Sequence, residues 1–355
     1  MFKFWSLVIE PILRAIGARR LVEIGVDSGA CTRHLLEYSA ATGGHLDYID
    51  PAPLFEVDAA QARYGAFSTF HRCTSLEALP RLSAADVVLI DGDHNWYTVH
   101  RELELLAEKA AETGTGFPLV LFHDVAWPYG RRDLYYAPER VPVAHRQPYA
   151  QKGMRPGVTE LLDKGGLSAQ LCNALREGGP RNGVLTAVED FVEESKVGTL
   201  QVIPILYGLG ILVPKRLEGH AALTAELQRW QSESGLKVLL ELLERERTVE
   251  QTDLQGEIVR LNALHETLAR RSEELSKLLQ VEHGAVLQQY AESDRLNAKC
   301  ERLASEAELH RQDRDRLRAE LDLIHSSHTW RWTSFVRTAS AILAGKEPWH
   351  AGNGK

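Results

Sequence analysis

Residues 21–29 read LVEIGVDSG, an apolar run that leads into two glycines four residues apart. The apolar run predicts a buried strand, and residues 30–41 after it predict a helix. Gly25 and Gly29 have no Cβ, so the backbone between strand and helix can approach a ligand closely. The helix directs its N-terminus, with its positive dipole end, at the same ligand. The spacing G-x-x-x-G differs from the dinucleotide-binding pattern G-x-G-x-x-G.

Strand-like runs recur along the first 215 residues. Further strands are predicted at residues 45–50, 68–72, 86–91, 119–124, 200–205 and 208–213. Residues 96–111, between two of these runs, have the apolar spacing of a helix. Because strands alternate with helices, the sequence favours a parallel sheet covered by helices on both faces. The last two runs are separated by a tight turn, which predicts a closing strand pair.

The composition narrows the class of protein. The chain has 355 residues, 44% of them apolar, and a formal net charge of −8, which excludes wholesale disorder and argues against a nucleic-acid partner. Four scattered cysteines without a C-x-x-C pair argue against a disulfide framework and a cysteine zinc site. No apolar run approaches the roughly 18–20 residues of a membrane span, and no signal peptide is recognised. A cytoplasmic protein is therefore expected.

An acidic residue, Asp50, ends the second predicted strand. A carboxylate at that place can accept hydrogen bonds from ribose hydroxyls. With this acid, the E-x-G-x-x-x-G turn and the closing strand pair, residues 15–215 resemble the class I S-adenosylmethionine-dependent methyltransferases. The resemblance implies an α/β fold with a Rossmann-like doubly wound sheet and an antiparallel last strand.

The same resemblance implies a binding site for S-adenosyl-L-methionine. In it, Gly25 and Gly29 would face the methionine moiety, Glu23 would order the loop, and Asp50 would bind the ribose. The adenine would lie near residues that follow the third strand. The remaining residues assigned to this cofactor site are Asp27, Ser75 and Leu76.

A second group of polar residues follows the fourth and fifth predicted strands. Residues 91–94 read DGDH, and His123 and Asp124 end the next strand. The carboxyl ends of neighbouring parallel strands open into one crevice. Carboxylates with an imidazole suit a hard divalent cation such as Mg²⁺, which can lower the pKa of a bound hydroxyl. As an alternative, Asp91 and Asp124 would only cap helices, and His94 would be an exposed loop residue.

The segment IDGDH at residues 90–94 resembles the I-D-G-x-H motif of metal-dependent sugar O-methyltransferases, a group that includes macrolide-sugar methyltransferases and cephalosporin-hydroxylase-like proteins. The resemblance implies that Asp91 and Asp124 bind the metal and that His94 is the general base. His123 stands where relatives often carry an acid, so the metal's identity stays open.

A basic and aromatic segment follows the fifth strand, within an expected insert at residues 126–185. Arginines bind phosphate or carboxylate, and aromatic faces stack on sugar rings. A carbohydrate acceptor is predicted here, the alternative being a solvated loop with packing tyrosines. The residues assigned to the acceptor are Trp127, Tyr129, Arg131, Arg132 and Tyr136.

Together these features predict methyl transfer from S-adenosylmethionine to a sugar hydroxyl, on a bacterial surface polysaccharide or its precursor. A natural-product O-methyltransferase that acts on a small molecule is one alternative. A coiled-coil scaffold with a non-catalytic methyltransferase fold is another.

The C-terminal part of the sequence has a different pattern. Residues 215–347 contain no proline, and apolar residues recur every seven positions through about ten heptads. The seam residues are Leu254, Leu261, Leu268, Leu275, Leu296, Leu303, Leu317 and Ile324. This pattern predicts a coiled coil, and hence a homo-oligomer, but it leaves the number of strands open.

Four segments are therefore expected: a methyltransferase domain at 1–215, a helical linker at 216–250, a coiled coil at 251–325, and an aromatic and basic tip at 326–355. The tip resembles a short S-x-x-W-R-x-T motif that ends coiled coils in some bacterial polysaccharide glycosyltransferases. It would dock to the inner face of the membrane or to a glycan-assembly partner, or it would simply close the coiled coil.

Overall fold

The computed structural model describes residues 1–327 together with 333, 336, 340, 341, 343 and 344. It divides into two compact units, Met1–Thr252 and Asp253–Lys355. The predicted tip lies, apart from these few residues, outside the described residues, and its docking stays a prediction. No helix in the described part of the chain is both long enough and apolar enough to cross a membrane.

The first unit is built on a seven-stranded sheet with the order β3-β2-β1-β4-β5-β10-β9. Strands β1 to β5 are parallel, and β10 runs antiparallel to both β5 and β9. The predicted α/β fold with an antiparallel strand is confirmed. The strands are β1 (Arg20–Ile24), β2 (His45–Ile49), β3 (Ser68–His71), β4 (Val87–Ile90), β5 (Leu119–His123), β9 (Gly198–Ile203) and β10 (Leu209–Pro214).

The strand order reverses at β1, which lies between β2 and β4. Ile24, the last residue of β1, is in register with Ile49 on β2 and Ile90 on β4. The three strands therefore end at the same edge of the sheet. The connections after β1 and its neighbours run to opposite faces of the sheet, and a crevice opens between them. This is the place where ligands bind in open α/β sheets.

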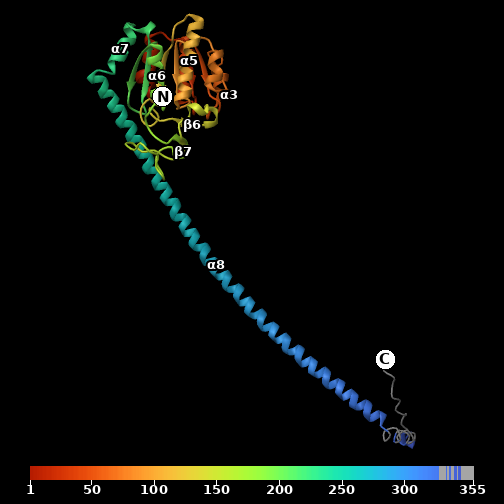
Figure 1. Cartoon of the computed structure of the whole chain (residues 1–355). Helices are drawn as coiled ribbons and strands as arrows, with labels where there is room; N and C mark the ends of the chain where they lie inside the picture. The colour runs from red at the N-terminus through yellow and green to blue at the C-terminus, as the bar shows by residue number, and fades with distance from the viewer. Residues whose placement is uncertain (328–332, 334–335, 337–339, 342, 345–355) are drawn as a thin grey trace. The chain divides into compact units, whose positions relative to one another are not determined.

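Two layers of helices cover the sheet, because alternate strand residues point to opposite faces. On one face, Leu21 and Leu89 pack with the N-terminal helices, α2, α7 and the beginning of α8. On the other face, Val22 and Val88 pack with α5 and α6, which lie side by side (Figure 1). The α-helices are α1 (Glu10–Ala15), α2 (Ala30–Thr42), α3 (Val57–Tyr64), α4 (Ser75–Ala78), α5 (Trp96–Thr113), α6 (Val184–Ser195), α7 (Ala221–Arg229) and α8 (Glu233–Ser326).

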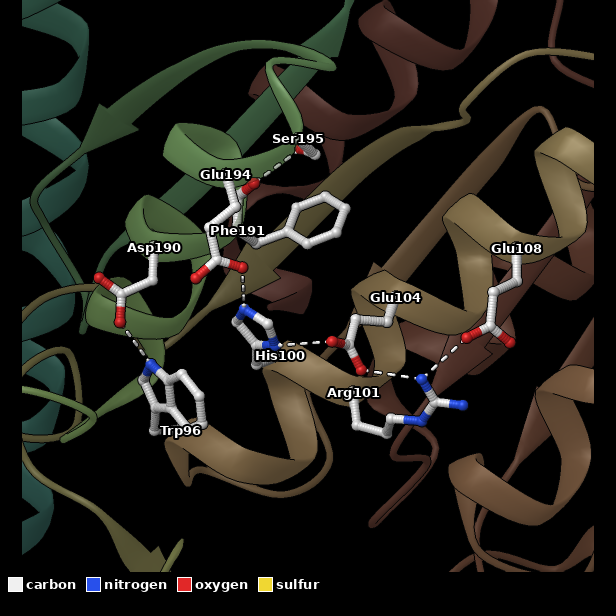
Figure 2. Close-up of polar contacts among 9 residues, drawn as sticks. All are labelled: Trp96, His100, Arg101, Glu104, Glu108, Asp190, Phe191, Glu194 and Ser195. Atoms are coloured by element: carbon white, nitrogen blue, oxygen red, sulfur yellow. Dashed lines mark hydrogen bonds and ion pairs between the residues drawn. The ribbon is translucent and has the colours of Figure 1, made fainter.

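Polar side chains join α5 to α6 at the edge of their apolar contact. Figure 2 shows His100 of α5 between two carboxylates, with its Nε2 3.3 Å from Glu194 of α6 and its Nδ1 3.6 Å from Glu104. Trp96, the first residue of α5, donates its indole N–H to Asp190 of α6 at 2.7 Å. These contacts fix the start of α5, and α5 directly follows the polar segment 91–94.

The segment 216–250, expected as a linker, packs onto the first unit. Leu223, Leu227 and Trp230 lie within the core, as does Leu239 of α8. The compact unit accordingly continues to Thr252. The absence of proline predicts where long helices begin. It does not predict whether the apolar residues of those helices pack against the preceding domain.

Beyond Thr252, α8 is a single helix without buried residues up to Ser326. It contains the predicted heptad leucines, whose side chains are about half exposed; Leu268, for example, is 59% exposed. The long helix is confirmed. Its pairing with another helix stays a prediction at this stage.

Candidate functional site

A cavity of about 1470 Å³ lies over the carboxyl ends of the parallel strands. Its floor is formed by the loops after β1, β2, β3, β4 and β5, and the insert after β5 forms one wall. Of the residues predicted for the site, those lining the cavity are Gly25, Asp27, Asp50, Ser75, Leu76, Asp91, His94, His123, Asp124, Tyr129 and Tyr136.

The turn after β1 requires glycine for two reasons. Gly25 has a φ of +87°, and a Cβ on it would lie 2.2 Å from the carbonyl oxygen of Asp91. Its amide donates to the carbonyl of Ile49 at 2.9 Å. The turn is therefore locked between the ends of β2 and β4, and its backbone faces the cavity.

Asp50 holds the same turn in place from the end of β2. Its Oδ2 accepts hydrogen bonds from the amides of Val26 and Asp27, at 2.9 and 3.1 Å. Its Oδ1 accepts a third from the amide of Ala52 at 2.7 Å. A carboxylate has about four lone-pair sites, so Oδ1 keeps one for a ligand hydroxyl.

Two residues predicted for the cofactor site lie beneath the cavity. Glu23 is buried, and burial raises the pKa of its carboxyl to about 8. A Cβ on Gly29 would lie 2.1 Å from the ring of Phe55. Both residues therefore support the turn from below. Ser75 and Leu76 are positioned at the cavity by Thr74, which begins α4 with a capping box to Glu77.

Three ligand-type side chains meet where β4 and β5 end. Single donor atoms of Asp91, His123 and Asp124 all lie within 4.8 Å of one another. The Nδ1 of His123 is 3.2 Å from Asp91 Oδ1 and 3.1 Å from Asp124 Oδ2. Two carboxylates and one imidazole form a donor set that fits a divalent cation. The amino group of Met1 contacts Asp91 Oδ2 at 3.2 Å.

The charges of this cluster determine its protonation. Burial opposes ionisation of Asp91, but the Met1 amine and His123 outweigh it and hold the pKa of Asp91 well below its usual range. Burial also disfavours the charged form of His123, yet Asp91 and Asp124 raise its pKa to about 9. The cluster thus consists of ionised carboxylates whose negative charge is compensated by the Met1 amine and His123. A bound metal ion could supply this positive charge instead.

His94 lies beside this cluster, with its Nε2 2.7 Å from Asp124 Oδ2. Its other ring nitrogen, Nδ1, is buried without a hydrogen-bond partner among the described residues. The rings of Tyr129 and Tyr136 lie near it, with centroids 5.4 and 6.0 Å away. His94 is therefore held through Nε2. Burial opposes the charged form of its imidazole, but Asp124 outweighs burial and raises the pKa of His94 well above its usual range.

The alternative roles of these residues do not match the geometry. Asn95, not Asp91, caps α5, since its side chain accepts from the amide of Thr98. Asp124 is followed by the insert and not by a helix. His94 is only 8% exposed and is thus not a solvated loop residue.

The insert after β5 forms a small sheet of its own with the order β6-β8-β7. Its strands are β6 (Leu134–Tyr135), β7 (Tyr149–Gln151) and β8 (Cys172–Ala174). Asp133 holds it to the domain by accepting from the amides of Trp96 and Gly183, at 2.8 and 2.7 Å. Burial raises the pKa of this carboxyl to about 6.

Three of the predicted acceptor residues do not line the cavity. Arg132 is fully buried and donates to the carbonyls of Ala174 and Thr159. Arg131 forms a two-point ion pair with Glu189 on α6. Trp127 packs in the small apolar cluster of the insert. Both arginines therefore shape the insert, a role that their charge alone could not reveal.

The sequence analysis missed several residues that line the cavity. Some come from the loop after β3, others from the insert, and Tyr207 from the turn before β10. The loop after β3 and the insert were both expected near the site, but which of their side chains line the cavity depends on how the chain packs there. The missed lining residues include Arg72, Thr74, Leu134, Arg140, Val141, Leu167, Ser168, Leu171 and Tyr207.

The loops after β1, β2 and β4 and the cluster at the end of β5 all belong to one stretch of chain. Residues 22–125 match the family model of a methyltransferase domain. The match covers the glycine turn, Asp50, Asp91, His94 and the pair after β5. The N-terminal helices, the insert, α6, the closing strands and the C-terminal helices lie outside it. A search among curated proteins gives no significant match.

The solved structures to which this chain is similar include several methyltransferases, at low sequence identity. An SAH-bound methyltransferase from Podospora anserina is 15% identical, with a TM-score of 0.36 over 58% of this chain and 76% of that chain. A 1,6-didemethyltoxoflavin-N1-methyltransferase from Burkholderia thailandensis is 12% identical, with a TM-score of 0.31 over 58% and 76%. A methyltransferase from Geobacter sulfurreducens is 10% identical, with a TM-score of 0.31 over 57% and 75%.

Proposed function

We propose that this chain is an S-adenosylmethionine-dependent O-methyltransferase that acts on a sugar hydroxyl, on a bacterial surface polysaccharide or its precursor. One observation carries the proposal. The residues that match a methyltransferase domain are also those that form the floor of the cavity. A nucleoside cofactor and an acceptor would both fit, since a cavity of about 1470 Å³ exceeds the usual range of single-ligand pockets.

S-adenosylmethionine would supply an activated methyl group, and a bound divalent cation such as Mg²⁺ would lower the pKa of the acceptor hydroxyl. The glycine turn at Gly25, which is packed closely against the backbone of Asp91 and lines the cavity, would face the methionine end of the cofactor. Asp50 would accept a ribose hydroxyl at the free lone pair of its Oδ1. Asp91, His123 and Asp124 would hold the cation.

His94 would remove the proton from the acceptor hydroxyl. Asp124 engages its Nε2 and fixes the ring. Because Asp124 also raises the pKa of His94, the ring would act as a base only from its neutral form, with Nδ1 taking the proton. A general base must lie within hydrogen-bond reach of the proton it takes, and His94 lines the cavity beside the cation cluster. Asp91 and His94 would therefore have separate roles: Asp91 would bind the cation, and His94 would accept the proton.

The acceptor would lie against the wall formed by the insert. Tyr129 and Tyr136 present aromatic faces there, and sugar rings stack on such faces. Arg140 adds a cation that suits an acidic or phosphorylated sugar.

A second candidate is a natural-product O-methyltransferase that acts on a small molecule. It is favoured by the apolar residues on the same wall, Leu134, Val141 and Leu171. These would suit an acceptor with a hydrophobic ring better than a polar glycan. Rates with nucleotide sugars, oligosaccharides and small phenols would separate the two. Faster methylation of neutral phenols than of any glycan would exclude the carbohydrate proposal.

The cofactor proposal is tested by calorimetry of S-adenosylmethionine binding, with and without Mg²⁺. We expect the wild type to bind the cofactor, and Asp91→Ala to lose the effect of Mg²⁺. Asp163→Ala is the matched control, because Asp163 is an exposed carboxylate paired only with Lys152. If the wild type does not bind the cofactor, the proposal is wrong. Cofactor binding with no turnover of any acceptor would favour a non-catalytic scaffold.

A further inference from the structure

The heptad face of α8 beyond Thr252 is an apolar surface with no partner in a single chain. We propose that it pairs with a second copy of this chain in a parallel, in-register, two-stranded coiled coil over residues 254–324. This inference does not depend on the proposed methyltransferase activity. It rests on exposure, charge and the place of one cysteine.

The exposed leucines share one seven-residue register, which is interrupted by the polar residues Glu282, Gln289 and His310. Leu254, Leu261 and Leu268 are 64%, 49% and 59% exposed. The same seven-residue spacing continues through Leu296 and Leu303. A stripe of this length would be an aggregation hazard if left in water, and helices with such spacing bury it against each other.

The stripe has two rows, which correspond to the d and a positions of a heptad. The leucines above are at d, and the residues four positions later are at a. Among the a residues, Ile258 and Val286 are β-branched and are 57% and 45% exposed. They are the two β-branched residues among the ten a positions from 258 to 321, and with leucine at d such residues favour two strands over three or four. Polar residues at a, such as Ser272, lower the stability of a coiled coil but help to specify its register.

Charges beside the stripe favour a parallel pair in register. In that arrangement, a residue at position g faces the residue five positions later, at e, on the other chain. Glu306 would then face Arg311, and Asp313 would face Arg318. Both pairs are of opposite charge, and no g–e pair over residues 257–325 unites like charges. Residues five apart are not neighbours within one helix. Arg311 and Asp313 also form ion pairs within α8, with Glu308 and Arg316, and the g–e contacts to a second chain would add to these.

Cys300 gives the orientation a chemical marker. It occupies an a position and is an exposed free thiol. In a parallel pair a faces a, so the two Cys300 residues meet, whereas in an antiparallel pair a faces d. An interaxial distance of about 9–10 Å and a Cα radius of about 2.3 Å leave about 4.4–5.4 Å between facing Cα atoms. That separation is within the range of a disulfide.

The first experiment measures mass and cross-linking on the full chain. Sedimentation equilibrium should give two chains per particle; a mass of one chain, or of three or more, would overturn the proposal. Diamide, which takes up the two electrons and two protons of the thiols, should then join the chains into a dimer. Cys300→Ser should abolish this product.

A matched variant controls for random collision of thiols. Cys300→Ser combined with Ser305→Cys moves the thiol to position f, which faces away from the seam. Its cross-linking should be at least about tenfold slower, because facing geometry is lost. Equal rates for Cys300 and for the displaced thiol would contradict the parallel seam.

A charge exchange tests the register. Glu306→Arg or Arg311→Glu alone should raise the dissociation constant of the dimer about two- to fivefold, the range of exposed ion pairs. The double variant should restore it, because the exchanged charges again face each other. Circular dichroism of each variant verifies that the helix is retained. If the double variant is as weak as the singles, the in-register pairing is wrong.

Discussion

Leucines have opposite environments in the two units of this chain. Leu89 and Leu121 in the sheet are fully buried, whereas Leu268 and Leu303 in α8 are 59% and 54% exposed. The domain buries its apolar surface within one chain, so its folding does not require a partner. The α8 segment from Asp253 to Ser326 has no buried residues, so under our proposal its stability depends on association. Matched substitutions in the two regions should therefore have different consequences.

The largest expected difference is between the same substitution at two leucines. Leu121→Ala should lower the free energy of unfolding of the domain by about 2–5 kcal/mol, because it leaves a cavity in a packed core. Leu268→Ala should leave the unfolding of the domain unchanged and only weaken association of the chains. Chemical denaturation followed by tryptophan fluorescence measures the first effect, and sedimentation measures the second. Equal destabilisation of the domain by both would break the contrast.

Substitution of two glycines, Gly25 and Gly114, distinguishes the effect of a steric collision from that of backbone strain alone. Gly25→Ala should cost about 2–4 kcal/mol and abolish cofactor binding, since φ is +87° and the new Cβ would meet Asp91 at 2.2 Å. Gly114→Ala has a similar φ of +66° but no atom within 4 Å. It should cost only about 1 kcal/mol and spare binding. Calorimetry with S-adenosylmethionine and thermal unfolding give both quantities. Unimpaired binding in Gly25→Ala would contradict the role of the turn.

The buried carboxyl of Glu102 should make the domain pH-sensitive in a way that the α8 segment is not. Burial raises its pKa from 4.5 to about 8, so the folded state holds this proton more tightly than the unfolded state. Its contribution to stability is complete below about pH 4.5 and is lost as the pH rises through about 8. Glu102→Gln should flatten this dependence, with a gain over the wild type of at least about 1 kcal/mol at pH 9. Parallel pH profiles for both proteins would refute it.

The smallest effect is expected at the surface of the insert. Arg131 and Glu189 form an ion pair whose side chains are 41% and 47% exposed. Arg131→Ala should therefore lower domain stability by only about 0.2–1 kcal/mol, and less at high salt. Thermal unfolding at two salt concentrations measures this. A change above about 2 kcal/mol would mean that the pair holds the insert more firmly than exposed pairs do.

Prediction from sequence succeeded for the sheet and was partial for the site. Glycine turns, strand-ending acids and the DGDH segment are local signals, so Gly25, Asp50 and Asp91 were found with their strands. The insert was recognised, yet Arg131 and Arg132 were assigned to the acceptor because arginine clusters often bind anions. The structure instead pairs Arg131 with Glu189 and buries Arg132 against backbone carbonyls. These partners lie more than 25 residues away, where local sequence gives no guide.

The sequence by itself determined the succession of strands and helices along the chain, the polar residues at the carboxyl ends of the strands, and the heptad spacing of α8. Each follows from periodicity or from the chemistry of adjacent residues. Only the tertiary structure decided that His94 uses Nε2 toward Asp124, and that the segment 216–250 belongs to the core. Those outcomes depend on which distant surfaces pack together. Packing is set by complementary shape and burial across the whole domain, and a local pattern does not encode it.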